Sequence, residues 1–348
     1  MMKYIIFCIT ILLIPVSPAI GQDGSISHLT IHAASLEGNL IEDSPDLSVG
    51  VYLPPGYDIR APKRYPVIYW LHGFSGKGKS TAKAGWKGGP VKAINQLISS
   101  GSLKPVIIVM PDGTNRFGGS MYTNSLATGN WEDFIAYELP EFIDAHYRTI
   151  PKSESRGIAG HSMGGYGAIK IAMKHPDIFS AVYGTSPCCL ARSSTDMSQN
   201  IIDEAISIDS WEALAKGSFW SKIILAQSAA YAPNPDNPPF YGDLPYALAG
   251  DSTSISENAK AKWLANLPAR MADQYISNLQ QLQAIAFDAG TRDVPEILAN
   301  SEYFSNTLTR IEVSNSYEVF EGGHNDKVGE RIRTKILPFF SEVLKSEE

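Results

Sequence analysis

Short apolar runs that alternate with helical segments constrain the fold of this chain more than any other feature of its sequence. The runs in the first half have the length and composition of buried strands, and they lie at residues 49–53, 67–71, 106–110, 158–159 and 181–183. The clearest helical segment between them is 131–146, where Phe134, Leu139 and Ile143 share one face. Strands that alternate with helices predict an α/β fold, with a mostly parallel central sheet covered by helices on both faces.

The strand pattern is interrupted after about residue 190. Polar helical stretches and a proline-rich run at 232–239 take its place until about residue 283. Strand signals return at 284–287 and 317–320, and a helical run at 328–344 closes the chain. Large single-sheet enzymes reach this chain length. We therefore expect a single domain at residues 22–348, with a helical insertion at about 190–283.

Residues 1–21 have the features of a secretory signal peptide. Lys3 precedes an uncharged, largely apolar run at 4–14, and small residues lead to Gly21. The run is shorter than the roughly 20 apolar residues that a membrane-spanning helix needs, and Pro15 follows it directly. We expect cleavage near Gly21, and therefore a secreted or periplasmic protein without stable membrane insertion after cleavage.

Charge and cysteine content argue against two classes of protein. The 29 basic and 36 acidic residues leave no net positive field for a phosphate backbone, so we expect no nucleic-acid partner. Cys8 would depart with the signal peptide, which leaves Cys188 and Cys189 and excludes a disulfide-stapled fold. These neighbours form either a strained vicinal bridge or, as we favour, two small apolar side chains that pack in the interior.

The sequence GHSMG at residues 160–164 matches the pattern G-x-S-x-G. It lies between the strand run at 158–159 and a helical run that starts near Gly165, which is the context of a nucleophile elbow. The turn is so tight that Cβ atoms beside the serine would collide with backbone, and flanking glycines avoid this. A glycine-rich turn without catalysis is the alternative. The context favours Ser162 as the nucleophile.

A serine hydroxyl needs a base within hydrogen-bond reach and a carboxylate that orients the base. In this type of fold the order along the chain is Ser, then Asp or Glu, then His. Only His175 and His324 follow Ser162. His175 precedes Pro176 at the end of the elbow helix, which favours a capping or surface role. His324 follows the last strand run in a glycine-flanked loop, and we predict that it is the general base.

Two aspartates after the penultimate strand run compete for the role of the carboxylate. Asp288 is expected at the very end of the strand and Asp293 in the turn beyond it. We favour Asp293, because a residue in the turn lies closer to the site expected at the carboxyl ends of the strands. Asp288 is then expected to form a structural hydrogen bond.

The oxyanion of a tetrahedral intermediate needs two backbone N–H donors. Met163, which follows the nucleophile, is the first. The second is expected in the loop after the strand run at 67–71, where His72-Gly73-Phe74 resembles an HG-type oxyanion motif. We favour Phe74, with Gly73 as the alternative.

Several fragments in a fixed order resemble one known family. They are VYLPPGY at 51–57, YPV at 65–67, LHG at 71–73, MPDG at 110–113, ELP at 138–140, GHSMGG at 160–165 and GGH at 322–324. Together they resemble the esterase D family of α/β-hydrolases, which includes feruloyl esterases, S-formylglutathione hydrolases, enterochelin esterases and mycobacterial mycolyltransferases. The resemblance extends from about Ser48 to His324, except for the insertion.

The resemblance implies the α/β-hydrolase fold and ester hydrolysis through an acyl-serine intermediate, without metal or organic cofactor. Its triad falls on Ser162, Asp293 and His324. Export favours feruloyl or other polysaccharide-linked esters, or a small-molecule ester. The alternatives are an acyltransferase that uses the same acyl-enzyme, as mycolyltransferases do, and a siderophore esterase.

Three aromatic residues, Trp86, Tyr122 and Trp131, are candidates for the lining of the substrate site. An indole there would stack on a sugar or phenolic ring. Plain packing in the interior is the alternative for each of them.

Overall fold

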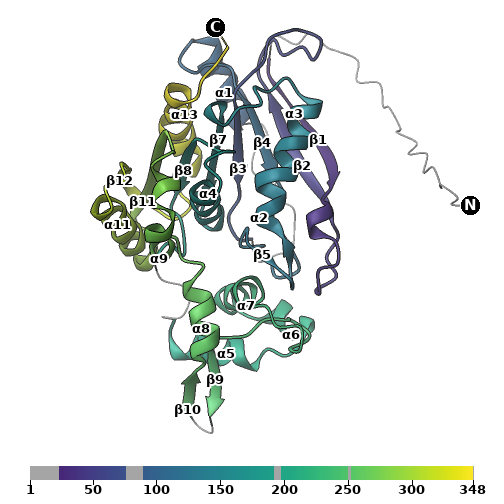
Figure 1. Ribbon diagram of the computed structural model, residues 1–348, viewed down its shortest axis with the longest axis vertical. Helices are drawn as coiled ribbons and strands as arrows, with labels where there is room; N and C mark the ends of the chain where they lie inside the picture. The colour runs from purple at the N-terminus through teal and green to yellow at the C-terminus, as the bar shows by residue number, and fades with distance from the viewer. Residues whose placement is uncertain (1–22, 76–88, 192–196, 250–251, 348) are drawn as a thin grey trace, which may run out of the picture.

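The computed structural model describes residues 23–75, 89–191, 197–249 and 252–347. The predicted signal peptide and Trp86 therefore lie outside the described residues. At the centre is an eight-stranded sheet with the order β1-β2-β4-β3-β7-β8-β11-β12 (Figure 1). Its strands are β1 (Ser25–His32), β2 (Asp46–Leu53), β3 (Val67–Leu71), β4 (Ile107–Pro111), β7 (Arg156–His161), β8 (Ala181–Thr185), β11 (Ala284–Arg292) and β12 (Ser316–Gly323).

The sheet is mostly parallel. β2 pairs antiparallel with β1 and with β4, whereas every pair from β4 through to β12 is parallel. Seven of these strands contain the apolar runs that the sequence predicts. β1 was not predicted. It lies at the edge of the sheet, where polar and apolar residues alternate, so it contains no continuous apolar run of the kind that marked the other strands.

Helices cover both faces because successive strand residues point to opposite sides. On β3, Ile68 and Trp70 pack in one core, together with Phe340, whereas Tyr69 and Leu71 pack in the other. The first face is covered by α1 (Gly89–Ser99), α12 (Val328–Arg331), η6 (Ile332–Ile336) and α13 (Leu337–Val343). The second is covered by α2 (Trp131–Asp133), η2 (Phe134–Glu138), α3 (Leu139–His146), α4 (Met163–Lys174) and α11 (Pro295–Arg310).

The predicted helical segments match these elements closely. α2, η2 and α3 form one continuous helical run over residues 131–146, as predicted. The closing helical run is α12, η6 and α13. Short elements connect the larger ones, namely η1 (Ala34–Leu36), β5 (Asn124–Ser125), β6 (Gly129–Asn130) and η3 (Ser153–Ser155).

The segment after residue 190 forms a lobe at one end of the molecule (Figure 1). It comprises α5 (Gln199–Ser207), α6 (Trp211–Lys216), α7 (Phe219–Tyr231), the hairpin of β9 (Tyr246–Ala249) and β10 (Ser252–Ile255), and α8 (Glu257–Leu264). The chain then returns to the sheet through α9 (Pro268–Met271), η5 (Ala272–Tyr275) and α10 (Ile276–Leu279). The lobe has its own apolar cluster, in which Leu214, Leu225 and Phe240 pack against Phe117 of the main body. The sequence did not predict the hairpin.

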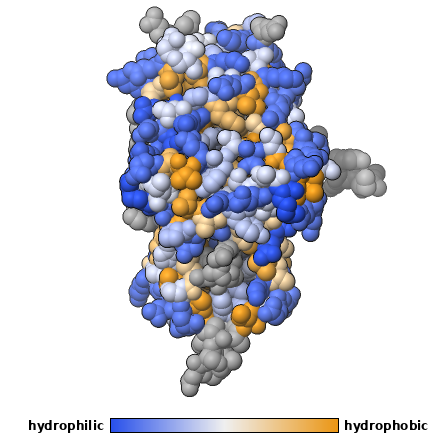
Figure 2. Space-filling view, turned by 90° about the vertical axis from the view of Figure 1, so that its left-hand side faces the viewer, coloured by the Kyte–Doolittle hydropathy of each residue, from blue (hydrophilic) through white to orange (hydrophobic). Residues whose placement is uncertain are grey.

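Hydrophilic residues predominate on the face shown in Figure 2, and hydrophobic residues occur there in small groups. Among the described residues, no helix combines the length and the apolar character that crossing a bilayer requires.

Candidate active site

Ser162 lies in a strained turn between β7 and α4. Its φ of 56° and ψ of −118° place it in a region that residues with a side chain rarely adopt. The Ser162 N–H donates to Thr185 O on the neighbouring strand at 3.0 Å, and the Ser162 carbonyl accepts from the N–H of Tyr166 at 3.0 Å. Hydrogen bonds on both sides thus hold the strained residue in place.

The glycines on either side make this turn possible. A Cβ atom on Gly160 would lie 2.3 Å from the carbonyl carbon of Gly164, and one on Gly164 would lie 2.0 Å from Leu71 O. Both clashes are with backbone, which cannot swing away as the end of a side chain can. Strand β3, strand β7 and helix α4 therefore approach one another as closely as the sequence pattern predicts.

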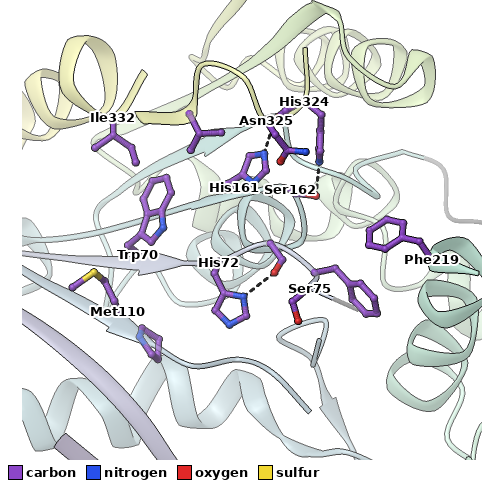
Figure 3. A pocket seen from close by; sticks show the side chains of 14 residues that line it. Trp70, His72, Ser75, Met110, His161, Ser162, Phe219, His324, Asn325 and Ile332 are labelled. Carbon is purple, nitrogen blue, oxygen red and sulfur yellow. Dashed lines mark hydrogen bonds between the residues drawn. The ribbon is translucent and has the colours of Figure 1, made fainter. Parts of the chain in front are cut away.

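His324 approaches Ser162 from the loop that follows β12. Its Nε2 lies 3.0 Å from Ser162 Oγ, and its Nδ1 lies 2.8 Å from Asp293 Oδ1. Figure 3 shows the His324 ring directed at Ser162. The Asp293 side chain is fully buried, whereas 23% of the His324 side chain is exposed. The three side chains form a continuous chain of hydrogen bonds that ends at the cavity.

The environment of Asp293 favours its ionised form. Burial raises the pKa of this carboxyl group, but the hydrogen bonds from His324 and the N–H of Val294, the Ser186 hydroxyl and the charge interaction with His324 together outweigh burial. The pKa of Asp293 therefore lies below its usual value. An ionised acceptor orients Nδ1–H of His324 towards itself and leaves Nε2 free to accept a proton.

Asp288 does not lie at the end of β11, as the sequence suggested, because the strand continues to Arg292. Its side chain accepts hydrogen bonds from Tyr183 Oη at 2.8 Å and Thr185 Oγ1 at 2.7 Å, and it pairs with Arg331. This buried position is structural. His175, the other competing residue, caps the C-terminus of α4 and contacts Glu132 at 3.0 Å, remote from the chain of hydrogen bonds at Ser162.

His161 supports the loop that carries His324. Its Nε2 donates to His324 O at 2.8 Å, and the centroids of the two rings are 4.7 Å apart. Burial and the neighbouring His324 lower the pKa of His161 to about 4. His161 is therefore a neutral hydrogen-bond donor near neutral pH, a role that the sequence analysis did not assign to it.

Phe74 and Met163, the predicted donors for an oxyanion, lie side by side. A Cβ atom on Gly119 would lie 2.5 Å from Met163 Sδ and 2.6 Å from Phe74 Cδ2, so both side chains press against this glycine. His72 braces the Phe74 loop, because its Nδ1–H donates to Gly73 O at 2.7 Å and its Nε2 accepts from the N–H of Gly113 at 2.8 Å.

Two of the aromatic residues predicted for the substrate site lie in the core instead. Trp131 is 2% exposed, and its indole donates to Thr128 O at 2.8 Å. Tyr122 is fully buried behind the loop of His72, Gly73 and Phe74, where its hydroxyl donates to His72 O at 3.1 Å. Both predictions were wrong, because both rings pack in the hydrophobic core on one face of the sheet.

Two cavities meet at Ser162. The larger, of about 530 Å³, lies between the elbow, α7 and α11, and the smaller, of about 380 Å³, extends towards Trp70 and Met110 (Figure 3). Phe219 from α7 lines both cavities and contacts Phe74 edge to face, with 5.7 Å between the ring centroids. The predicted insertion thus contributes a wall of the site. Nothing in the sequence singled out Phe219 from the other aromatic residues.

The described residues contain no group of three or more histidine, cysteine or acidic side chains arranged to hold a metal ion. Cys188 and Cys189 are free thiols with their sulfurs 2.9 Å apart, and both line the larger cavity. The expected packing of this pair in the interior is therefore only partly correct, because the thiols also face the site.

A mostly parallel sheet with a serine on a strained strand-to-helix turn, followed in the chain by an aspartate and a histidine, defines an α/β-hydrolase. The chain belongs to the esterase family described as "Putative esterase", which matches residues 44–328. The family resemblance and the fold class inferred from the sequence are both confirmed.

Individual proteins agree with this assignment. Esterase Rv1288 of Mycobacterium tuberculosis is 36% identical over 149 residues, which are 41% of this chain and 30% of that protein. The chain thus matches less than a third of the length of this relative.

Among solved structures, a ferulic acid esterase has a TM-score of 0.59 at 20% identity, over 93% of this chain and 99% of its own. An S-formylglutathione hydrolase from Agrobacterium tumefaciens has a TM-score of 0.61 at 18% identity, over 95% and 99% of the two chains. These structures share the fold.

Proposed function

We propose that this protein is a serine carboxylic-ester hydrolase in which Ser162, His324 and Asp293 form the catalytic triad. The observation that carries the proposal is the hydrogen-bonded chain from Ser162 Oγ through the His324 ring to the buried Asp293 carboxylate. Ser162 lies on the strained turn between β7 and α4, and it lines both cavities. Membership of an esterase family supports the same chemistry.

In the first half of the reaction, Ser162 Oγ attacks the carbonyl carbon of the ester while His324 Nε2 takes the hydroxyl proton. The carbonyl oxygen becomes an oxyanion, which the backbone N–H groups of Phe74 and Met163 stabilise. When the intermediate collapses, the bond to the alcohol oxygen breaks. His324 then gives its proton to the departing alcohol, and an acyl-serine remains.

In the second half, water replaces the alcohol. His324 takes a proton from the water as it attacks the acyl-serine, and the acid product leaves when the Ser162 Oγ bond breaks and Oγ regains its proton. Throughout, the ionised Asp293 stabilises the imidazolium that forms at His324. Its lowered pKa fits this role, because a protonated aspartate would offer His324 no negative charge.

For the substrate we propose feruloyl or other polysaccharide-linked esters that the protein meets after export. The larger cavity is mainly apolar, and its volume of about 530 Å³ lies within the range of small-molecule sites. The structural neighbours that are described as ferulic acid esterases support this choice. The sequence of residues 1–21 supports export.

The test is hydrolysis of a panel of p-nitrophenyl acyl esters and methyl hydroxycinnamates by wild type and by Ser162→Ala. We expect the variant to lose at least about 10³-fold in kcat while its circular dichroism and melting temperature stay unchanged. Retained turnover in the folded variant would falsify the role of Ser162. Serine-dependent turnover of p-nitrophenyl esters without any turnover of hydroxycinnamates would remove the feruloyl assignment.

A further inference from the structure

Asn300 is a polar residue on the buried face of α11. Its neighbours on that face are Ile297, Ser301 and Phe304, and the residue is 5% exposed. It lines the larger cavity together with the nucleophile. A polar group on the buried face of an amphipathic helix needs an explanation, because such groups are normally paired within the protein.

Among the described residues, none forms a hydrogen bond with the side chain of Asn300. The amide is not sealed from solvent, and it faces the cavity that Ser162 also lines. The other buried amide of this cavity, Gln227, donates to Cys189 Sγ at 3.1 Å. Asn300 therefore presents a donor and an acceptor to whatever enters the cavity.

The rest of the wall restricts what the ligand can be. Ile201, Ile223 and Ile297 make the cavity suited to an apolar ring or chain. Among the described residues that line it, there is no lysine or arginine and one acidic residue, Glu296, so this part of the wall does not favour an anionic end. An uncharged hydroxyl or carbonyl at the end of an apolar body fits these walls.

We propose that Asn300 is a specificity-determining residue that hydrogen-bonds an uncharged polar group on the bulkier part of the ester. The inference rests on the proposed ester hydrolysis at Ser162 and adds to it a requirement on the substrate. The preferred substrates have an aromatic or aliphatic group next to the scissile bond, and a hydroxyl or carbonyl at the far end of that group.

Two matched pairs of esters test the proposal. Methyl cinnamate and methyl p-coumarate differ by one hydroxyl on the acyl side, and phenyl acetate and 4-hydroxyphenyl acetate differ by one hydroxyl on the alcohol side. The variant is Asn300→Leu, with Asn300→Ala as a second variant if leucine perturbs folding. Ser198→Ala is the matched control, because it removes an exposed polar group from the wall of the same cavity.

In wild type, one of the two pairs should show about a 3- to 10-fold higher kcat/KM for the hydroxylated ester, the range expected for one neutral hydrogen bond. Asn300→Leu and Asn300→Ala should remove that preference, whereas Ser198→Ala should keep it. The pair that responds shows whether the acyl or the alcohol part occupies the cavity.

A preference that survives in both Asn300 variants overturns the inference, as does turnover of both pairs without any preference in wild type. In either case the proposed esterase activity stands. Absence of serine-dependent turnover for every ester overturns the proposed function, and this inference with it.

Discussion

The guanidinium of Arg331 donates two hydrogen bonds to Oδ2 of the buried Asp288, from Nε at 2.9 Å and from Nη2 at 2.6 Å. Arg331 belongs to α12, which follows the loop of His324, and Asp288 belongs to β11, which leads to Asp293. The pair therefore ties together the two segments that deliver the base and the acid. It also explains how two aspartates five positions apart have different roles.

Substitution of the two aspartates should separate these roles. Asp293→Asn should lower kcat by about 10⁴-fold with little loss of stability, because the amide no longer orients and stabilises the His324 ring. Asp288→Asn should instead lower the free energy of unfolding by about 3 kcal/mol, since it removes a charge from a buried pair. Activity assays and urea denaturation of both variants provide the measurement. Greater damage to kcat from Asp288→Asn would reassign the acid.

His161 should act by positioning His324. His161→Ala should lower kcat for p-nitrophenyl acetate by about 10- to 100-fold with a small change in KM, because small displacements of a catalytic group are costly. Since the pKa of His161 is about 4, it does not titrate above about pH 5, and the pH profile of kcat should keep its shape. His146→Ala, at an exposed histidine, is the control. Loss of the acidic limb of the profile in His161→Ala would show that His161 itself exchanges protons.

The glycines of the elbow should tolerate no side chain. Gly164→Ala would place a Cβ atom 2.0 Å from Leu71 O, so we expect loss of soluble protein or a melting temperature lower by about 10 °C or more, together with loss of activity. Gly329→Ala is the matched control in α12, where an added Cβ meets no atom within 4 Å. It should leave activity unchanged and stability equal or slightly higher. A stable, active Gly164→Ala would contradict the close approach of β3 and α4.

Glu132 should contribute stability that is lost in acid. Burial raises its pKa, but hydrogen bonds from His175 and Lys174 and the charge of Lys170 bring the pKa from 4.5 down to about 2. Because the folded-state pKa is the lower one, the contribution is complete above about pH 4.5 and disappears as the pH falls towards 2. It amounts to about 3 kcal/mol.

The measurement is the free energy of unfolding between pH 6 and pH 3 for wild type, Glu132→Gln and Glu342→Gln, the last at an exposed glutamate of α13. Glu132→Gln should be less stable at pH 6 and should lose less stability on acidification than wild type. The exposed control should follow the wild-type curve. Parallel curves for wild type and Glu132→Gln would show that Glu132 is not responsible.

Much of this architecture followed from local rules of the chain. Apolar runs of strand length place the strands, because a strand buried on both faces has to be apolar throughout. The glycines at 160 and 164 identify the elbow, since only the absence of Cβ atoms allows strand and helix to come so close. The position of His324 follows from the order of elements. The last strand is parallel to the strand before Ser162, so the carboxyl ends of both strands lie on the same side of the sheet.

Tertiary structure decided the rest, because the distances involved depend on segments far apart in the chain. Asp288 and Asp293 differ only in where β11 ends and in what packs against it, namely Arg331, 43 positions further along the chain. The sequence suggests Trp131 and Tyr122 as residues of the substrate site, yet in the structure both rings pack in the hydrophobic core on one face of the sheet. Phe219 and Asn300 reach the site because the insertion and α11 close around Ser162, and no local pattern specifies such an approach.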